Sequence, residues 1–280
     1  MSLSDRVLRA GASVAIFVAS SAVAQACAPI DYITLPLPAK ADDPAQTALR
    51  LAYPDIVFSQ DGTQLTIDGV TLEMGEITGR APADVLRQPT MAEQFAYAYP
   101  LDYDLTARET PWHDPGRIRH QGFLELLYAG TEVEIAASLR LVRFDGLADA
   151  GVRVTTLRGV DCQLDAAVSA IRETGGAFGP VFENPAGGFN WRVIAGTDRL
   201  SAHSFGIAVD LNIEYGGYWR WSGAPEGAVG HYEPRMPPEI VAAFERYGFI
   251  WGGKWHHYDG FHFEYRPELI LHARLLAANR

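Results

Sequence analysis

The sequence predicts an α+β fold in which a small antiparallel sheet carries helices packed on one side. Two segments, 207–212 and 261–265, alternate strictly between apolar and polar residues, as half-buried strands do. Four other segments repeat apolar residues at the three- to four-residue spacing of amphipathic helices. With 280 residues, 48% of them hydrophobic, the chain is long enough for one sizeable domain.

The first 24 residues are typical of a secretory signal peptide. Arg6 and Arg9 precede an apolar stretch over 10–23, which ends in the small-residue pattern Ala22-Val23-Ala24. This stretch is shorter than the roughly 20 residues needed to cross a bilayer, which argues against a membrane anchor. We therefore expect export to the periplasm or cell envelope, and no membrane span in the mature chain.

The negative net charge of the chain argues against nucleic acid as a partner. The net charge is −11, and removal of residues 1–24, whose own net charge is +1, leaves −12. A phosphate backbone would be repelled over most of such a surface. We expect no nucleic-acid partner.

The chain contains two cysteines, Cys27 and Cys162. In an exported protein, which meets an oxidising compartment, a disulfide between them is the simplest expectation. A lipidated Cys27 and two buried free thiols remain alternatives. Ala24-Gln25-Ala26 is a poor lipoprotein signal, because its middle residue is large and polar.

Residues 25–110 are expected to form an N-terminal extension with short β-hairpins. Prolines and small polar residues over 29–50 indicate a lead-in with little regular structure. Asp61-Gly62 and Asp68-Gly69 are dipeptides typical of tight turns, and they separate three strand-like segments, 55–59, 64–67 and 70–74.

Residues 111–280 are expected to form the main domain, with four helices. Asp114-Pro115 resembles a helix start and predicts a helix that ends before Gly130. Thr131 and Glu134 form a capping box for a shorter helix. The remaining two helices are predicted over about 162–173 and from Pro238 to Gly248.

Each of the two alternating segments carries a good metal ligand on its polar face, Asp210 in the first and His262 in the second. His203 lies in the loop before the first strand, and Gly206 lets the backbone turn between His203 and Asp210. A catalytic zinc ion is held by three imidazole or carboxylate ligands, with a fourth position open to water. The sequence therefore predicts a site for one Zn²⁺ ion made by His203, Asp210 and His262.

Asp259, three residues before His262, is placed to take a proton from water at this site. His257 and Asp259 share a face of an extended segment, which predicts that His257 orients Asp259. A structural alternative is a hydrogen-bonded cluster without a metal. The glycine at Gly206, the strict alternation around Asp210 and a second strand that carries His262 together favour the metal.

Two motifs carry a resemblance to a known family. Ser-x-His-x-x-Gly-x-Ala-x-Asp spans 201–210, and Trp-x-His-x-Asp-x-x-His-Phe-Glu spans 255–264. Together they resemble the zinc D-alanyl-D-alanine carboxypeptidases and L-alanyl-D-glutamate endopeptidases of bacterial cell walls. These are LAS-type metallopeptidases, whose core is shared with the hedgehog signalling domain. The resemblance is strong over about 189–269, and the segment 114–119 looks like an upstream feature of one exported branch.

The resemblance implies a hedgehog-like zinc peptidase domain over 111–280. Its substrate would be a peptidoglycan stem peptide or muropeptide. The three expected ligands would bind zinc, Asp259 would be the catalytic base and Arg192 would polarise the scissile carbonyl. Many relatives have glutamate where this chain has Asp259, and the aspartate is usual for the endopeptidase-like branch.

Four further residues are expected around this centre. Arg199 or Ser201 is expected to hold the substrate's carboxylate terminus. Glu264 is the nearest other carboxylate in the second motif, and His257 is the expected partner of Asp259.

Two rival interpretations remain. A catalytically silent zinc module that binds a cell-wall or protein partner would need neither Asp259 nor Arg192. A serine hydrolase built on Ser201 or Ser204 is disfavoured, because close neighbours on one strand do not readily form a catalytic line and no Gly-x-Ser-x-Gly motif is present. The bond that is cut depends on loops such as 215–230.

Overall fold

The computed structural model describes residues 27–194 and 197–279, and the expected signal peptide lies outside this part of the chain. Helices and small antiparallel sheets are mixed throughout, which confirms the α+β class. The described residues form three small sheets, of which the two-stranded sheet of residues 139–143 and 151–155 was not expected. In this part of the protein no helix combines the length and apolar character needed to cross a membrane.

The central sheet has the order β6-β8-β7 and is antiparallel throughout. Its strands are β6 (Ala208–Asp210), β7 (Phe249–Trp251) and β8 (His262–Tyr265), so both segments predicted as strands are confirmed. Helix α7 (Pro238–Arg246) packs on this sheet, with the Phe244 ring 4.3 Å from that of Phe263. His262 and Glu264 alternate with Phe263, and therefore face away from α7.

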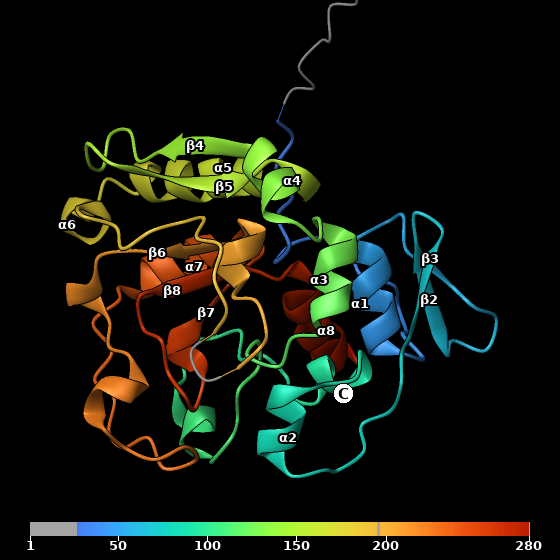
Figure 1. Cartoon of the computed structure of the whole chain (residues 1–280). Helices are drawn as coiled ribbons and strands as arrows, with labels where there is room; N and C mark the ends of the chain where they lie inside the picture. The colour runs from blue at the N-terminus through green and yellow to red at the C-terminus, as the bar shows by residue number, and fades with distance from the viewer. Residues whose placement is uncertain (1–26, 195–196, 280) are drawn as a thin grey trace, which may run out of the picture.

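A second layer lies above the central sheet in Figure 1. Helix α5 (Val160–Glu173) packs on α7, and its other side is covered by the hairpin of β4 (Leu139–Arg143) and β5 (Gly151–Thr155). Helices α5 and α7 were both predicted. The hairpin was not, although Val152 and Val154 alternate with polar residues and are buried against α5.

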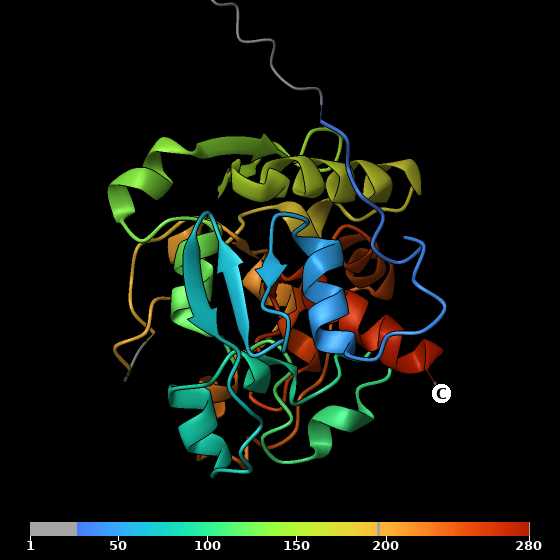
Figure 2. The same cartoon turned by 90° about the vertical axis from the view of Figure 1, so that its right-hand side faces the viewer.

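The lead-in expected over 29–50 is partly wrong, because helix α1 (Pro44–Ala52) begins inside it. Asp43 accepts a hydrogen bond from the Gln46 N–H, and Pro44 occupies the first turn, where its missing N–H costs nothing. The buried face of α1 packs against α8 (Pro267–Ala278), a helix that was not predicted either (Figure 2). Figure 2 also shows the hairpin sheet beside α1.

That sheet consists of β1 (Val57–Phe58), β2 (Gln64–Ile67) and β3 (Val70–Glu73) and confirms the expected hairpins. Asp68 and Gly69, between β2 and β3, have φ of 48° and 81°. Two successive positive φ angles are what a two-residue type I′ turn requires, and Asp-Gly is among the dipeptides that tolerate them best.

The helix predicted from Asp114-Pro115 begins later than expected. Helix α3 spans Gln121–Leu127, and the ring of His120 caps it by accepting the Phe123 N–H. Helix α4 (Glu132–Ala137) has the Thr131 cap that was predicted. The other short elements are α2 (Pro82–Arg87), α6 (Gly179–Phe182), η1 (Ala92–Phe95), η2 (Thr106–Glu109), η3 (Leu157–Gly159), η4 (Ala202–Phe205), η5 (Ile213–Tyr215), η6 (Trp219–Ser222) and η7 (Gly252–Lys254).

The N-terminal region and the rest of the chain share one hydrophobic core. A disulfide joins Cys27 to Cys162 at the start of α5, with the Cα atoms 5.5 Å apart. The hydroxyl groups of Tyr32 and Tyr265 are hydrogen-bonded at 2.8 Å. These contacts fix the early part of the chain against the sheet that carries the candidate ligands.

Candidate metal centre

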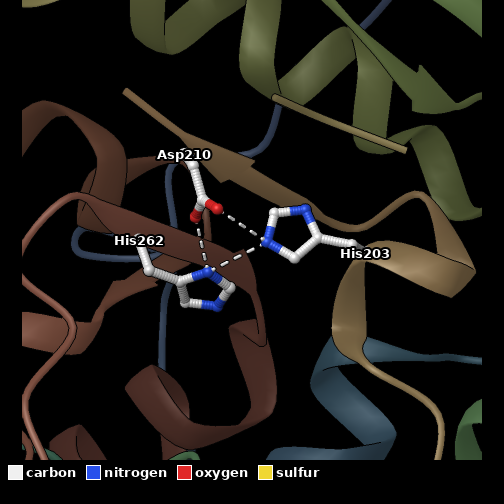
Figure 3. Close-up of side chains that lie close together, drawn as sticks. All are labelled: His203, Asp210 and His262. Carbon is white, nitrogen blue, oxygen red and sulfur yellow. Dashed lines mark hydrogen bonds and ion pairs between the residues drawn. The ribbon is translucent and has the colours of Figure 1, made fainter. Parts of the chain in front are cut away.

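The three expected ligands meet at one end of the central sheet (Figure 3). Asp210 ends β6 and His262 begins β8, and the two are directly opposite in the antiparallel register. His203 reaches them from η4. His262 Nδ1 lies 2.8 Å from Asp210 Oδ1, and His203 Nε2 lies 3.2 Å from Asp210 Oδ2 and 3.3 Å from His262 Nδ1.

The first motif folds locally so that His203 returns to the sheet. Ser201 accepts the His203 N–H through its hydroxyl and so caps η4. Gly206 then takes a φ of 66°, and a Cβ there would lie 2.9 Å from the backbone nitrogen of Thr155. Glycine is therefore needed both for the left-handed conformation and for the close approach to β5.

Both histidine rings are oriented by a second hydrogen bond. His203 Nδ1 is 2.6 Å from the Gly188 carbonyl oxygen, and His262 Nε2 is 3.0 Å from a carboxylate oxygen of Glu264. Because the carbonyl and the carboxylate accept hydrogen bonds from these nitrogens, the lone pairs of His203 Nε2 and His262 Nδ1 face each other and Asp210 when the rings are neutral. Metal-binding histidines are commonly held in this way.

Two of the candidate ligands, Asp210 and His262, also shift each other's pKa values. Burial opposes ionisation of Asp210, but the charges and hydrogen bonds of His203 and His262 outweigh it and hold the pKa of Asp210 well below its usual range. Burial alone would lower the pKa of His262, and the hydrogen bonds to Asp210 and Glu264 raise it to about 9. The carboxylates thus stabilise positive charge where a cation would be bound.

Asp259 adjoins the three ligands, and its surroundings raise its pKa. Burial is the main cause, and the negative charge of Asp210 adds to it. Asp259 Oδ2 is 3.9 Å from Arg117 Nη2. Asp259 Oδ1 is buried and has no hydrogen-bond partner among residues 27–194 and 197–279. A buried acceptor without a partner beside two imidazoles and a carboxylate fits a centre that holds a metal and a water molecule.

The structure corrects the prediction for His257, which does not orient Asp259 directly. His257 Nδ1 is hydrogen-bonded to the Asp114 carboxylate at 2.6 Å, and its Nε2 accepts the Gly227 N–H at 3.0 Å. Asp114 also accepts the His257 backbone N–H, which explains why it does not cap a helix. The two residues are linked through Arg117, whose Nε donates to the His257 backbone carbonyl at 2.6 Å and whose Nη2 lies 3.9 Å from Asp259.

Arg192 is exposed, and its guanidinium forms no hydrogen bond or ion pair with the described residues. Its backbone is fixed by Ser204, whose hydroxyl accepts the Arg192 N–H at 2.9 Å and lies 2.9 Å from the Arg192 carbonyl oxygen.

Ser201, the other serine considered for a hydrolase, serves as a helix cap. Both serine hydroxyls are thus engaged with the backbone, while His203 turns toward the ligand cluster, which is not the arrangement of a serine hydrolase.

Sequence reasoning missed two arginines that belong to this centre. Arg119 is 8% exposed on its side chain, and its Nε is 2.9 Å from the fully buried Glu264. Arg117 contacts Asp259, as described above. The only signal was the segment 114–119, where Arg117 and Arg119 are two residues apart and so share a face of an extended chain.

Replacing Glu264 with glutamine is expected to weaken Zn²⁺ binding by about 10- to 100-fold, because His262 loses the carboxylate that orients it. It should also lower the free energy of unfolding by about 3–5 kcal/mol, because the buried Arg119 loses its counter-charge. Zinc titration and urea unfolding of the metal-free protein measure the two effects.

Glu268→Gln is the matched control for this variant. Glu268 is equally buried and pairs with Arg266, but it does not contact His262. We expect a similar loss of stability with unchanged zinc affinity. Equal zinc affinity in the two variants would contradict the role of Glu264 in orienting His262.

Residues 195–265, or 71 of the 280, match a family model described as D-alanyl-D-alanine carboxypeptidase. The segment contains all three candidate ligands and Asp259, and the resemblance inferred from the two motifs is confirmed over it. The match supports the class of peptidases that act on D-alanyl-D-alanine in peptidoglycan, with an extracytoplasmic location. No curated protein and no solved structure gives a significant match to the chain.

Proposed function

We propose that the protein is a zinc-dependent peptidase that hydrolyses a peptide bond in the stem peptide of peptidoglycan. The bond is of the D-alanyl-D-alanine carboxypeptidase or the L-alanyl-D-glutamate endopeptidase type. One observation carries the proposal: three side chains that could hold a metal lie beside a buried Asp259 oxygen with no hydrogen-bond partner among the described residues, inside the segment that matches the family.

His203, Asp210 and His262 would hold the zinc ion, which when bound makes water more acidic and polarises a carbonyl group. Asp259 would accept the proton of the attacking water and donate it to the leaving amine. Glu264 and the Gly188 carbonyl keep the two imidazoles in the tautomers that bind a metal. Arg192 remains the proposed donor to the scissile carbonyl, with a guanidinium that is not engaged by the described residues.

The wider assignments are also proposals. We propose a hedgehog-like catalytic domain over 111–280, preceded by an extension over 25–110. The central sheet that carries the candidate ligands lies within 111–280, which supports this division. Export after removal of residues 1–24 agrees with the disulfide between Cys27 and Cys162, because such bonds persist in oxidising compartments.

Digestion of purified muropeptides, with the products weighed by mass spectrometry, tests the proposed function. We expect loss of a terminal D-alanine or cleavage after L-alanine, with activity abolished by a chelator and restored by Zn²⁺. A serine hydrolase would survive the chelator. A silent zinc module would bind the metal without turnover.

Replacing Arg192 with alanine is expected to lower kcat by about 10²–10³, the typical loss of one donor to a developing oxyanion, with bound zinc unchanged. Arg192→Lys should recover only part of this loss, because a point charge cannot reproduce the guanidinium fork. Steady-state kinetics and metal analysis of the same samples measure both effects. An unchanged kcat would remove Arg192 from the site.

A further inference from the structure

An exposed tryptophan lies at the end of the central sheet where the candidate ligands meet. Trp221 is 62% exposed, and every other aromatic side chain in the described part of the chain is buried or half-buried. Its ring stacks on that of Phe261, with the ring centroids 5.6 Å apart and the planes inclined by 28°. Phe261 directly precedes the candidate ligand His262 in the chain. The Phe261 carbonyl oxygen accepts the N–H of Leu211, which follows the candidate ligand Asp210, so the stack and the ligands share one end of the sheet.

The backbone around Trp221 is fixed by hydrogen bonds. The Trp221 N–H donates to the Tyr218 carbonyl at 2.9 Å, and the Ser222 hydroxyl donates to the Trp219 carbonyl at 2.7 Å. The Trp219 N–H in turn donates to the Tyr258 carbonyl at 3.0 Å, which ties η6 to the second motif. The stack covers one face of the indole of Trp221, and its high exposure leaves the other face open to solvent.

Tyr218 connects this indole to the candidate metal centre. The centroid of its ring is 6.1 Å from that of Trp221. Tyr218 also lines a cavity of about 210 Å³, together with Arg117 and His257, and its backbone pairs with that of Asp259 in an antiparallel bridge. The open face of Trp221 is therefore continuous with the cleft in which the substrate would be cut.

We propose that the open face of Trp221 stacks on a sugar ring of the glycan that carries the stem peptide. This inference rests on the proposed function. Alanine and glutamate, the residues at the bonds considered, are small or charged and offer no flat apolar face. A pyranose ring does offer one, because its C–H groups carry partial positive charge and attract the negative face of an indole. A neutral sugar is also not repelled by a chain whose net charge is −11.

Polar groups suited to sugar hydroxyls lie on the same loop. Arg220 and Glu226 form an ion pair at 3.5 Å, and both side chains are exposed and line the cavity. Binding sites for small polar molecules combine apolar or aromatic surface with a few donors and acceptors of this kind. Single exposed apolar residues are common on protein surfaces. The fixed stack, the neighbouring cleft and the polar pair together distinguish Trp221 from such a residue.

Calorimetric titration of the zinc-loaded protein with N-acetylmuramyl-L-alanine and with N-lactyl-L-alanine tests the proposal. The two probes share the lactyl group, the amide bond and the alanine carboxylate, and they differ in the sugar ring. Neither probe contains a bond that the proposed function cuts, so binding is measured without turnover. We expect the probe with the sugar to bind about 10-fold more tightly.

Trp221→Ala should abolish this preference, because the stacking face is lost. Trp221→Phe keeps an aromatic face and should retain part of the preference, whereas Trp221→Leu keeps apolar surface without that face and should retain little. Because Trp221 is exposed, these variants should remain folded. Val70→Ala is the control, since it removes an exposed apolar side chain from β3 in the N-terminal sheet, and it should keep the full preference.

Equal or undetectable binding of the two probes by the wild-type protein would overturn the proposal. So would a preference that survives Trp221→Ala. A preference of the same size in Trp221→Leu as in Trp221→Phe would also contradict it, because apolar contact alone would then explain the binding. Failure of the proposed function gives a different result: the preference for the sugar persists, and no muropeptide is cleaved.

Discussion

Replacing His262 with alanine is expected to remove bound zinc and, with it, all measurable peptidase activity. In the proposed site His262 would be one of three protein ligands from the described residues, and the two remaining ligands would not keep the affinity of the site. His203→Ala and Asp210→Ala should have the same effect. Metal analysis of the purified variants, together with muropeptide digestion, measures both losses.

His272→Ala is the control for the loss of a buried imidazole. His272 is 6% exposed and packs edge-on against Phe95, away from the ligand cluster. This variant is expected to keep its zinc and its activity, with some loss of stability. Stoichiometric zinc in all three ligand variants would show that the cluster is a hydrogen-bonded group without a metal.

Asp259→Asn is expected to lower kcat by about 10²–10⁴ while the protein keeps its zinc. An amide nearly preserves the shape of the carboxylate but cannot accept the proton of water, and general-base catalysis contributes about this much to rate. Asp259 is not among the three clustered ligands, so metal content should not change. Steady-state kinetics and metal analysis of the same preparation measure the two quantities.

Asp198→Asn makes the same chemical change at an exposed residue in the segment before the first motif, and it should leave kcat unchanged. Near-normal turnover of Asp259→Asn would exclude Asp259 as the base. Glu264 would be a poor replacement, because it is fully buried and its oxygens already accept from Arg119, Arg266 and His262.

The elements that were predicted correctly from the sequence are those whose conformation is determined by residues close to them in the chain. Alternation around Asp210 and His262 placed both residues on strands, and the Asp68-Gly69 turn placed a hairpin. In each case the signal and the contact lie within a few residues. The pairing of these two strands across about 50 residues was not predicted, and only the expectation that Asp210 and His262 serve one ion brought the two segments together.

The failures came from contacts between distant segments. Asp43-Pro44 and Asp114-Pro115 look alike in sequence, and only the first opens a helix. Asp43 has no competing hydrogen-bond partner for its side chain among residues 27–194 and 197–279, and it caps α1. Asp114 is 143 residues from His257 and accepts two hydrogen bonds from it. Local propensity cannot reveal that competition, because the deciding partner is placed by tertiary packing.

Arg117 and Arg119 escaped prediction for a related reason. An arginine in a sequence is most often a solvated surface residue, and nothing within a few residues of the pair marks it as buried. Their burial depends on Asp259 and Glu264, which lie about 140 residues later in the chain. The family match also begins after both arginines, at residue 195.

The disulfide between Cys27 and Cys162 has a consequence for when the chain can become stable. It joins residues 135 positions apart, and closing a loop of that length removes chain entropy from the unfolded state worth about 5 kcal/mol. That is a large share of the 5–15 kcal/mol by which domains are usually stable. In a reducing cytosol the bond does not persist, so under the export proposed above a precursor would be closer to the unfolded state that translocation requires. The bond, formed after export, would then stabilise the folded chain in the compartment where it acts.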